Sequence, residues 1–139
     1  MDPLTKTWFS LGLVFVALFN FWTAMRVFGK TTPSPNPKLY LRLHRIGGYV
    51  FLFYFALISW ICIDLMARLS AAGKPLDVRG FYHGMLSFTL FFLLLLKISF
   101  VRFFRKFQPQ AGIAIGITMT VGTLVIWSIA GWMFLILVS

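Results

Sequence analysis

The chain has 139 residues, of which 60% are hydrophobic and 12% are charged, and its mean hydropathy is +0.88. Soluble globular domains carry about 25% charged residues, so this composition excludes an ordinary soluble domain and indicates an integral membrane protein. The net charge of +10 does not indicate nucleic-acid binding, because the basic residues stand in short segments between apolar runs, where they set topology. The single cysteine, Cys62, lies in an apolar run and forms no disulfide within the chain.

The first apolar stretch covers about residues 7–28, which is enough to cross the hydrocarbon core as a helix of about 20 residues. It is preceded by Asp2 and Pro3 rather than by a basic segment, and it reaches Arg26 without a small-residue cleavage signature. We therefore interpret this stretch as a retained transmembrane helix and not as a signal peptide.

Three further stretches have the length of a transmembrane helix, at about 40–67, 80–104 and 111–138. The proline-rich connector at 31–37 favours an extended strap, and a tight basic turn at 105–110 makes the last two helices antiparallel neighbours. We expect an all-α fold, a single antiparallel bundle of four transmembrane helices spanning residues 1–139. It would be a multi-pass protein of a bacterial inner membrane or an equivalent energy-transducing membrane.

The distribution of basic residues predicts the orientation of this bundle. One side would carry nine Lys and Arg residues, namely Arg26, Lys30, Lys38, Arg42, Arg45, Lys97, Arg102, Arg105 and Lys106. The other side would carry four, namely Lys6, Arg68, Lys74 and Arg79, together with all three acidic residues. By the positive-inside rule the nine-charge side is cytoplasmic and both termini are on the outer side.

The fourth span contains a stripe of small residues, Gly112, Gly116 and Thr120, at four-residue spacing. Such a stripe lets another helix approach closely. The stripe serves either packing within the monomer or contact in a dimer, and the sequence leaves both alternatives open.

The two histidines, His44 and His83, each lie about one turn inside the start of a span. Ionisable residues at membrane depth are costly and are usually functional, and a neutral imidazole is a common axial ligand of haem iron. Gly47 and Gly48 lie on the His44 face and Gly84 follows His83, so that a flat macrocycle would find room beside each ring. We therefore predict haem ligation by His44 and His83.

Basic residues accompany both histidines. Arg42 and Arg45 flank His44, and Arg79 precedes His83, so that each could pair with haem propionates. The alternative is that these histidines and arginines are interfacial anchors, which are common at the ends of membrane helices.

The two histidines cannot bind the same haem. They stand at the starts of antiparallel helices, so with about 1.5 Å rise per residue their depths differ by about 27 Å, and each needs another ligand. Lys97 lies four turns after His83 at the level of His44, where it would ligate iron, contact a propionate or snorkel to the interface. Thioether candidates are Met25 on that level and Met66, Met85 and Met133 on the other.

The placing of His44 at the head of one span and of Tyr82-His83-Gly84-Met85-Leu86 at the head of the next resembles the transmembrane di-haem cytochrome b group. This group includes the ascorbate-reducible and ferric-reductase-like cytochromes, and the resemblance covers about residues 38–106. It implies a four-helix core with two b-type haems, one near each membrane face, each held by histidines of two helices. The family core has four histidines and this chain has two, so a homodimer or a partner cytochrome subunit would supply the others.

The leading hypothesis is a b-type cytochrome, or a haem-bearing anchor subunit of a redox complex, with one or two haem b groups. It would transfer electrons across the membrane or to and from quinone, as an electron-transfer subunit more than as a stand-alone enzyme. The alternatives are a haem-free structural accessory subunit and a small transporter or channel component. Two smaller expectations are a surface ion pair between Asp64 and Arg68 and an interfacial anchoring role for Tyr54.

Overall fold

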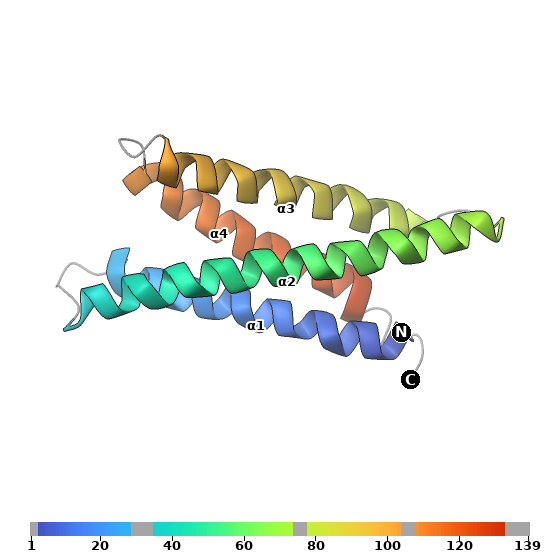
Figure 1. The fold of residues 1–139 in the computed structure, drawn as a ribbon, viewed down its shortest axis with the longest axis horizontal. Coiled ribbons are helices and arrows are strands. Elements are labelled where there is room, and N and C mark those ends of the chain that lie inside the picture. The colour runs from blue at the N-terminus through green and yellow to red at the C-terminus, as the bar shows by residue number, and fades with distance from the viewer. Residues whose placement is uncertain (1–2, 29–34, 74–77, 104–107, 133–139) are drawn as a thin grey trace.

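The structure, a computed structural model, describes residues 3–28, 35–73, 78–103 and 108–132. It consists of four long helices, α1 (Pro3–Phe28), α2 (Pro37–Ala71), α3 (Val78–Arg102) and α4 (Gln108–Trp127), followed by a π-helical turn, η2 (Ser128–Trp132) (Figure 1). All four helices are long and apolar enough to cross a membrane. The protein is therefore a multi-pass integral membrane protein whose described part is all-α.

The predicted spans each correspond to one of these helices. The helices α2 and α4 both begin three residues earlier than the predicted spans at 40–67 and 111–138. The last part of the fourth predicted span, residues 133–138, lies outside the described residues, as do most of the proline-rich connector and much of the basic turn.

The ends of α2 follow from local chemistry. Pro37 occupies the first turn, where its fixed φ suits a helix and its missing N–H is not needed. At the other end Gly73 has a φ of +69°, and its N–H donates to the carbonyl of Ser70, so that glycine ends the helix in a left-handed conformation. With 35 residues, α2 is about 52 Å long at 1.5 Å per residue and exceeds the hydrocarbon thickness of about 30 Å.

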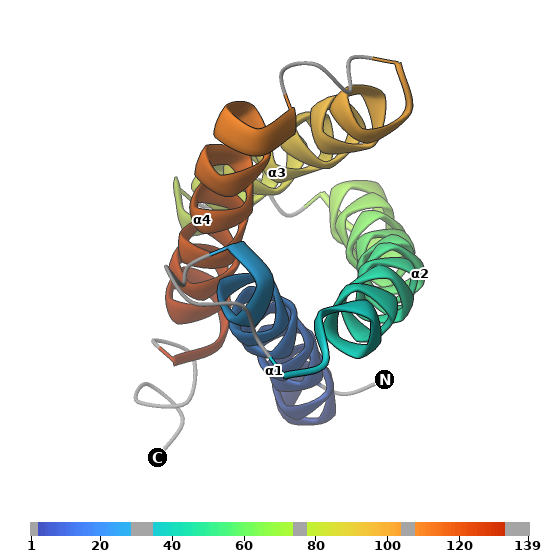
Figure 2. The ribbon, with the colours of Figure 1, turned by 90° about the vertical axis from the view of Figure 1, so that its left-hand side faces the viewer.

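The four helices run antiparallel to their chain neighbours, and α1 packs against α2 and α4 while α4 packs against α3 (Figures 1 and 2). The start of α1 and the end of η2 lie at the same end of the bundle, which we call the terminal end. The opposite end we call the basic end, because it holds the described basic residues Arg26, Lys38, Arg42, Arg45 and Arg102.

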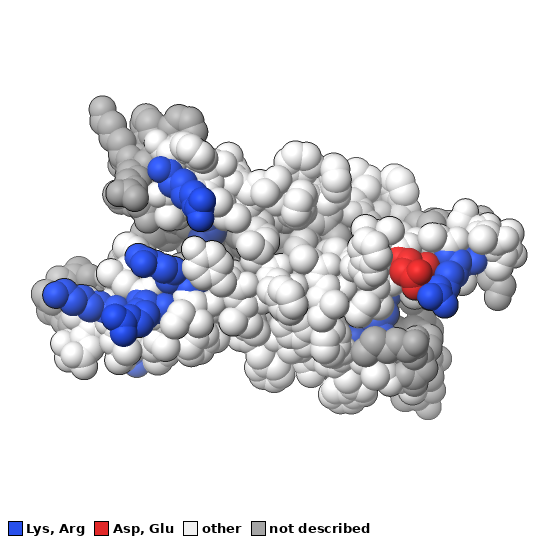
Figure 3. Space-filling model, viewed as in Figure 1, with Lys and Arg blue, Asp and Glu red and all other residues white. Residues whose placement is uncertain are grey.

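Charged side chains gather at the two ends of the bundle and leave an uncharged band between them (Figure 3). Large apolar side chains are exposed within this band, and Phe53 and Trp60 each keep 74% of their surface accessible. Exposed apolar surface of this extent marks contact with lipid in a protein with four membrane spans.

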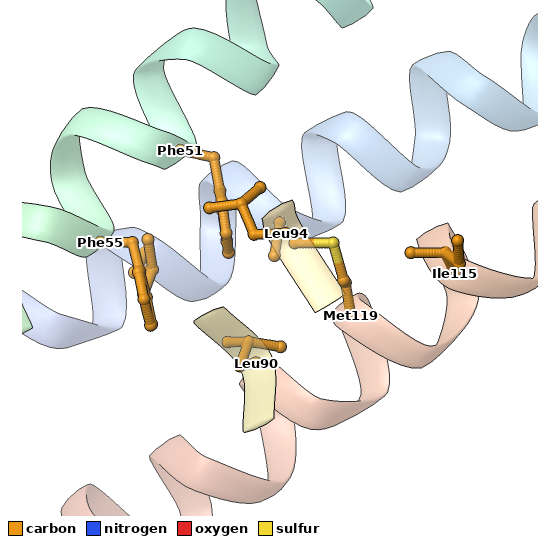
Figure 4. Packing of buried hydrophobic residues seen from close by; sticks show 8 residues of the cluster. Phe51, Phe55, Leu90, Leu94, Ile115 and Met119 are labelled. Atoms are coloured by element: carbon orange, nitrogen blue, oxygen red, sulfur yellow. The ribbon is translucent and has the colours of Figure 1, made fainter. Parts of the chain in front are cut away.

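The buried core is small and lies where the helices meet in the middle of the bundle. Phe51 and Phe55 of α2 face Leu90 and Leu94 of α3 and Met119 of α4 (Figure 4). The core joins residues from all four helices and so holds the bundle together midway between its two ends.

Tyr54 links α1 to α2 by a polar contact inside the membrane. Its hydroxyl donates a 2.5 Å hydrogen bond to the carbonyl oxygen of Phe9 and lies where a Cβ on Gly12 would be. The predicted interfacial anchoring role of Tyr54 is therefore wrong, because the side chain reaches across to a neighbouring helix instead of to the membrane surface.

Candidate functional site

The four helices surround a cavity of about 400 Å³ at the basic end, the end that faces the viewer in Figure 2. Most of its lining is aliphatic or aromatic. The exceptions with polar or charged side chains are Asn20, His44, Arg45, Tyr49, Lys97, Arg102 and Thr120. A site with this character, mostly apolar with a few convergent polar groups, is typical of a small-molecule or cofactor site.

His44 lines this cavity, and its ring is oriented by α1. Its Nδ1 lies 3.0 Å from the carbonyl oxygen of Asn20 and 3.3 Å from the hydroxyl of Thr23. Since a carbonyl oxygen only accepts, Nδ1 carries the proton in this arrangement, and Nε2 keeps its lone pair. The Thr23 hydroxyl donates to the same carbonyl at 3.0 Å, and Thr23 is fully buried.

This arrangement has the chemistry of a metal-ligating histidine. Such histidines almost always donate their second ring N–H to a carbonyl or carboxylate, which holds the tautomer and the ring orientation. The contact of His44 Nδ1 with the carbonyl oxygen of Asn20 is a hydrogen bond of this kind.

The two adjacent glycines after His44 have different roles. A Cβ on Gly47 would lie 2.5 Å from Oδ1 of Asn20, whereas a Cβ on Gly48 would meet nothing within 4 Å. Gly47 therefore permits the close approach of α1 and α2, and only Gly48 lines the cavity. The expectation that both glycines leave room for a ligand does not describe Gly47, because Asn20 occupies that space.

The small-residue stripe of α4 forms one wall of the cavity. Gly112, Gly116 and Thr120 all line it, and a Cβ on Gly116 would meet nothing within 4 Å. The close helix approach in α4 occurs instead at Gly122, where a Cβ would lie 3.2 Å from Leu90 of α3. Within the monomer, Gly116 thus borders open space and not another helix.

Positive charge collects around the cavity. Arg45, Lys97 and Arg102 line it, and Lys97 is half-buried. Among the described residues the acidic side chain is Asp64, which lies at the terminal end and pairs with Arg68 at 2.9 Å. No described carboxylate thus compensates the charge of the cavity, which suits a ligand with anionic groups. Arg42 is exposed and is not among the lining residues.

His83 lies at the terminal end, apart from this cavity. Its Nε2 is 3.9 Å from the sulfur of Cys62, and its Nδ1 is buried without a hydrogen-bond partner among the described residues. Gly84 has the methyl group of Met66 near it, at 3.9 Å from the position of a Cβ. The side chains of Arg79 and Met133 lie outside the described residues.

The structure thus divides the predicted site residues into two groups. One group surrounds the cavity and comprises His44, Arg45, Gly48, Lys97 and Met25. The other group comprises His83 and Gly84, with Met66 beside them.

Sequence reasoning missed three residues with polar contacts to the histidines, Asn20, Thr23 and Cys62. Asn20 and Thr23 could have been found, because two polar residues less than one turn apart in an apolar span commonly face another helix. The described residues contain no group of three or more His, Cys, Asp or Glu side chains placed to hold a metal ion.

No protein-family model, no curated protein and no solved structure matches the chain.

Proposed function

We propose that the protein is a small b-type cytochrome, or the haem-bearing anchor subunit of a membrane redox complex, with His44 as an axial ligand in the basic-end cavity. The observation that carries this proposal is the hydrogen bond from His44 Nδ1 to the Asn20 carbonyl, which leaves Nε2 for iron beside a cavity of about 400 Å³.

The walls of the cavity fit a b-type haem in three respects. Arg45 and Arg102 would pair with the two propionates, since no described carboxylate competes for them. Gly48 and Gly116 leave backbone without side chains beside the macrocycle. The rest of the lining is apolar and would exclude water from the iron. This would raise the free energy of the oxidised haem, which carries the net charge.

The second axial position would be taken by one of the two lining residues that the sequence placed at this level, Lys97 and Met25. Lys97 would offer its amine and Met25 its thioether. When bound, the haem would take up and release one electron, and the chain would orient it and tune its potential. The proposal concerns one haem for each chain, because His83 stands apart from the cavity and its neighbour is Cys62.

We further propose that the basic end is cytoplasmic and that both termini are on the outer side, as the positive-inside rule predicts. A haem near the cytoplasmic face would exchange electrons with membrane quinone or with a partner subunit docked at that end.

A reduced-minus-oxidised absorption spectrum of the protein, purified in detergent after expression with haem precursor, tests the proposal. We expect b-type bands with one haem for each chain, loss of the bands in His44→Gly, and their return on addition of imidazole. Thr23→Val is the matched control, because it removes the hydrogen bond between the Thr23 hydroxyl and His44 Nδ1 and keeps the imidazole ligand. His83→Gly should also keep the bands. Wild-type protein without a b-type spectrum would refute the proposal.

A haem-free accessory subunit is the second candidate function. It is favoured by the fact that the contacts of His44 with Asn20 and Thr23 also join α1 to α2, which is a structural role. In that case His44→Gly would lower stability only, imidazole would restore nothing, and the wild-type protein would carry no pigment.

A further inference from the structure

A second set of metal-ligand side chains lies at the terminal end, where α2 and α3 face each other. Cys62 and Met66 are one turn apart on α2 and so share a face of that helix. His83 of α3 approaches this face, with its Nε2 3.9 Å from the sulfur of Cys62. The methyl group of Met66 lies beside Gly84, the residue after His83. Cys62, Met66 and His83 are all half-buried.

The spacing of Cys62 and His83 fits two ligands of one ion. With metal bonds of about 2.0 Å to nitrogen and about 2.3 Å to sulfur, ligand atoms at tetrahedral to trigonal angles stand roughly 3.5 to 3.7 Å apart. The observed 3.9 Å between Nε2 and the sulfur is slightly longer, so a bound ion would draw the two ligand atoms closer together.

The same contact is poor as a hydrogen bond. A thiol is a weak donor and a weak acceptor, and the other ring nitrogen, Nδ1, is buried without a hydrogen-bond partner among the described residues. Whichever nitrogen carries the proton, the ring is left with one weak contact and one unsatisfied atom at membrane depth. A bond from Nε2 to a metal ion would replace the weak contact with a strong one. Nδ1 would then carry the proton, still without a partner among the described residues, unlike Nδ1 of His44.

We propose that Cys62, Met66 and His83 form a binding site for Cu(I). Thiolate, thioether and imidazole are soft or intermediate ligands, and this combination favours Cu(I) over hard cations, which require oxygen ligands. Binding would displace the thiol proton of Cys62 to solvent, and the thiolate would neutralise the single charge of the ion. The filled site would therefore be neutral, as a site among apolar helices requires, whereas a divalent ion would leave it charged.

This site is independent of the proposed haem, because its ligands lie at the terminal end and the cavity lies at the basic end. Either proposal can fail without the other, since copper binding is measured by competition and haem content by absorption.

An anaerobic titration of the detergent-purified protein with Cu(I), in competition with a bathocuproine chelator, tests the site. We expect one Cu(I) for each chain. Cys62→Ser and His83→Gln should each weaken binding by more than about 100-fold, the upper range for loss of an outer-shell partner, and Met66→Leu by about 10-fold. Met85→Leu is the matched control, because Met85 is 55% exposed and belongs to the same helix as His83, so its affinity should equal that of wild type.

X-ray absorption at the copper edge identifies the ligands independently. Wild-type protein should show two sulfur neighbours and one nitrogen neighbour, and Met66→Leu should lose one sulfur. The proposal is overturned if wild type and Cys62→Ser bind Cu(I) equally, if Met85→Leu weakens binding as much as Met66→Leu, or if Zn(II) binds as tightly as Cu(I). Variants that do not elute as monodisperse protein are replaced by Cys62→Ala, which removes the sulfur and keeps a small apolar residue.

Discussion

His44 and His83 occupy equivalent places in their helices, yet their surroundings differ. His44 has the carbonyl of Asn20 and the hydroxyl of Thr23 at its Nδ1 and a cavity beside it. His83 has the sulfur of Cys62 at its Nε2 and a buried Nδ1 without a hydrogen-bond partner among the described residues. The chemistry of each histidine is therefore decided by the helix packed opposite it, and not by its position in its own span.

The largest change in stability should come from a side chain added where α1 and α2 approach closely, beside His44. Gly47→Leu would place a side chain on Asn20, because even its Cβ would lie 2.5 Å from Oδ1. We expect a loss of about 2 to 3 kcal/mol in the free energy of unfolding, measured by denaturant titration in detergent. Gly48→Leu gains the same helix propensity without the collision, so it should keep stability and lose haem. Equal destabilisation by both substitutions would contradict this account of the two glycines.

Replacement of each histidine by leucine should change the free energy of unfolding in opposite directions. His44→Leu removes the hydrogen bond to Asn20 in the α1 and α2 contact, so we expect a loss of about 1 kcal/mol in the free energy of unfolding. His83→Leu removes a ring with an unsatisfied buried nitrogen, so the metal-free protein should lose nothing and should gain up to about 1 kcal/mol. Thermal unfolding of the metal-free and haem-free proteins measures both, and a larger loss at His83 would reverse the comparison.

The hydrogen bond of Tyr54 is a second polar contact between α1 and α2, besides that of His44, and it can be tested separately. Tyr54→Phe removes the hydroxyl that donates to the Phe9 carbonyl and keeps the ring that packs edge-on against Phe9. We expect a loss of about 0.5 to 1.5 kcal/mol in the same unfolding measurement. Tyr82→Phe removes a hydroxyl from a tyrosine that is 56% exposed and should change stability by less. A smaller effect at Tyr54 than at Tyr82 would argue against the interhelical hydrogen bond.

The smallest effect should come from the ion pair at the terminal end. The side chains of Arg68 and Asp64 are 77% and 51% exposed and lie one helical turn apart. An exposed pair at this spacing contributes about 0.3 to 0.5 kcal/mol, and salt screens it. Asp64→Asn should therefore lower the thermal midpoint slightly at low salt and leave it unchanged at high salt. A large effect that persists at high salt would show that Asp64 has another role.

The existence and length of the four helices could be predicted from the sequence, because the requirement for about 20 apolar residues acts on local composition. The antiparallel pairing of α3 with α4 followed from the short turn between them and is confirmed. The ends of the helices were less predictable. For example, α2 continues past the apolar run to Ala71 and ends only where Gly73 adopts a positive φ.

The candidate site could be predicted only in part. His44 and Lys97 were expected at one level of the bundle, because helical periodicity and span direction determine depth, and both line the cavity. The partners of His44 were not predicted, since contacts with Asn20 and Thr23 join residues more than 20 positions apart.

The four membrane spans, the charged ends and the two imidazoles within the helices could all be recognised in the amino-acid sequence alone. The packing of the helices was needed to see that Gly47 meets Asn20 while Gly48 faces open space, and that the stripe of α4 lines a cavity. The physical reason is that lipid selects for apolar length, whereas neighbouring positions on a helix point about 100° apart. The rotation of each helix about its axis therefore decides which of two neighbouring residues meets another helix. In these uniformly apolar spans no local sequence pattern encodes that rotation.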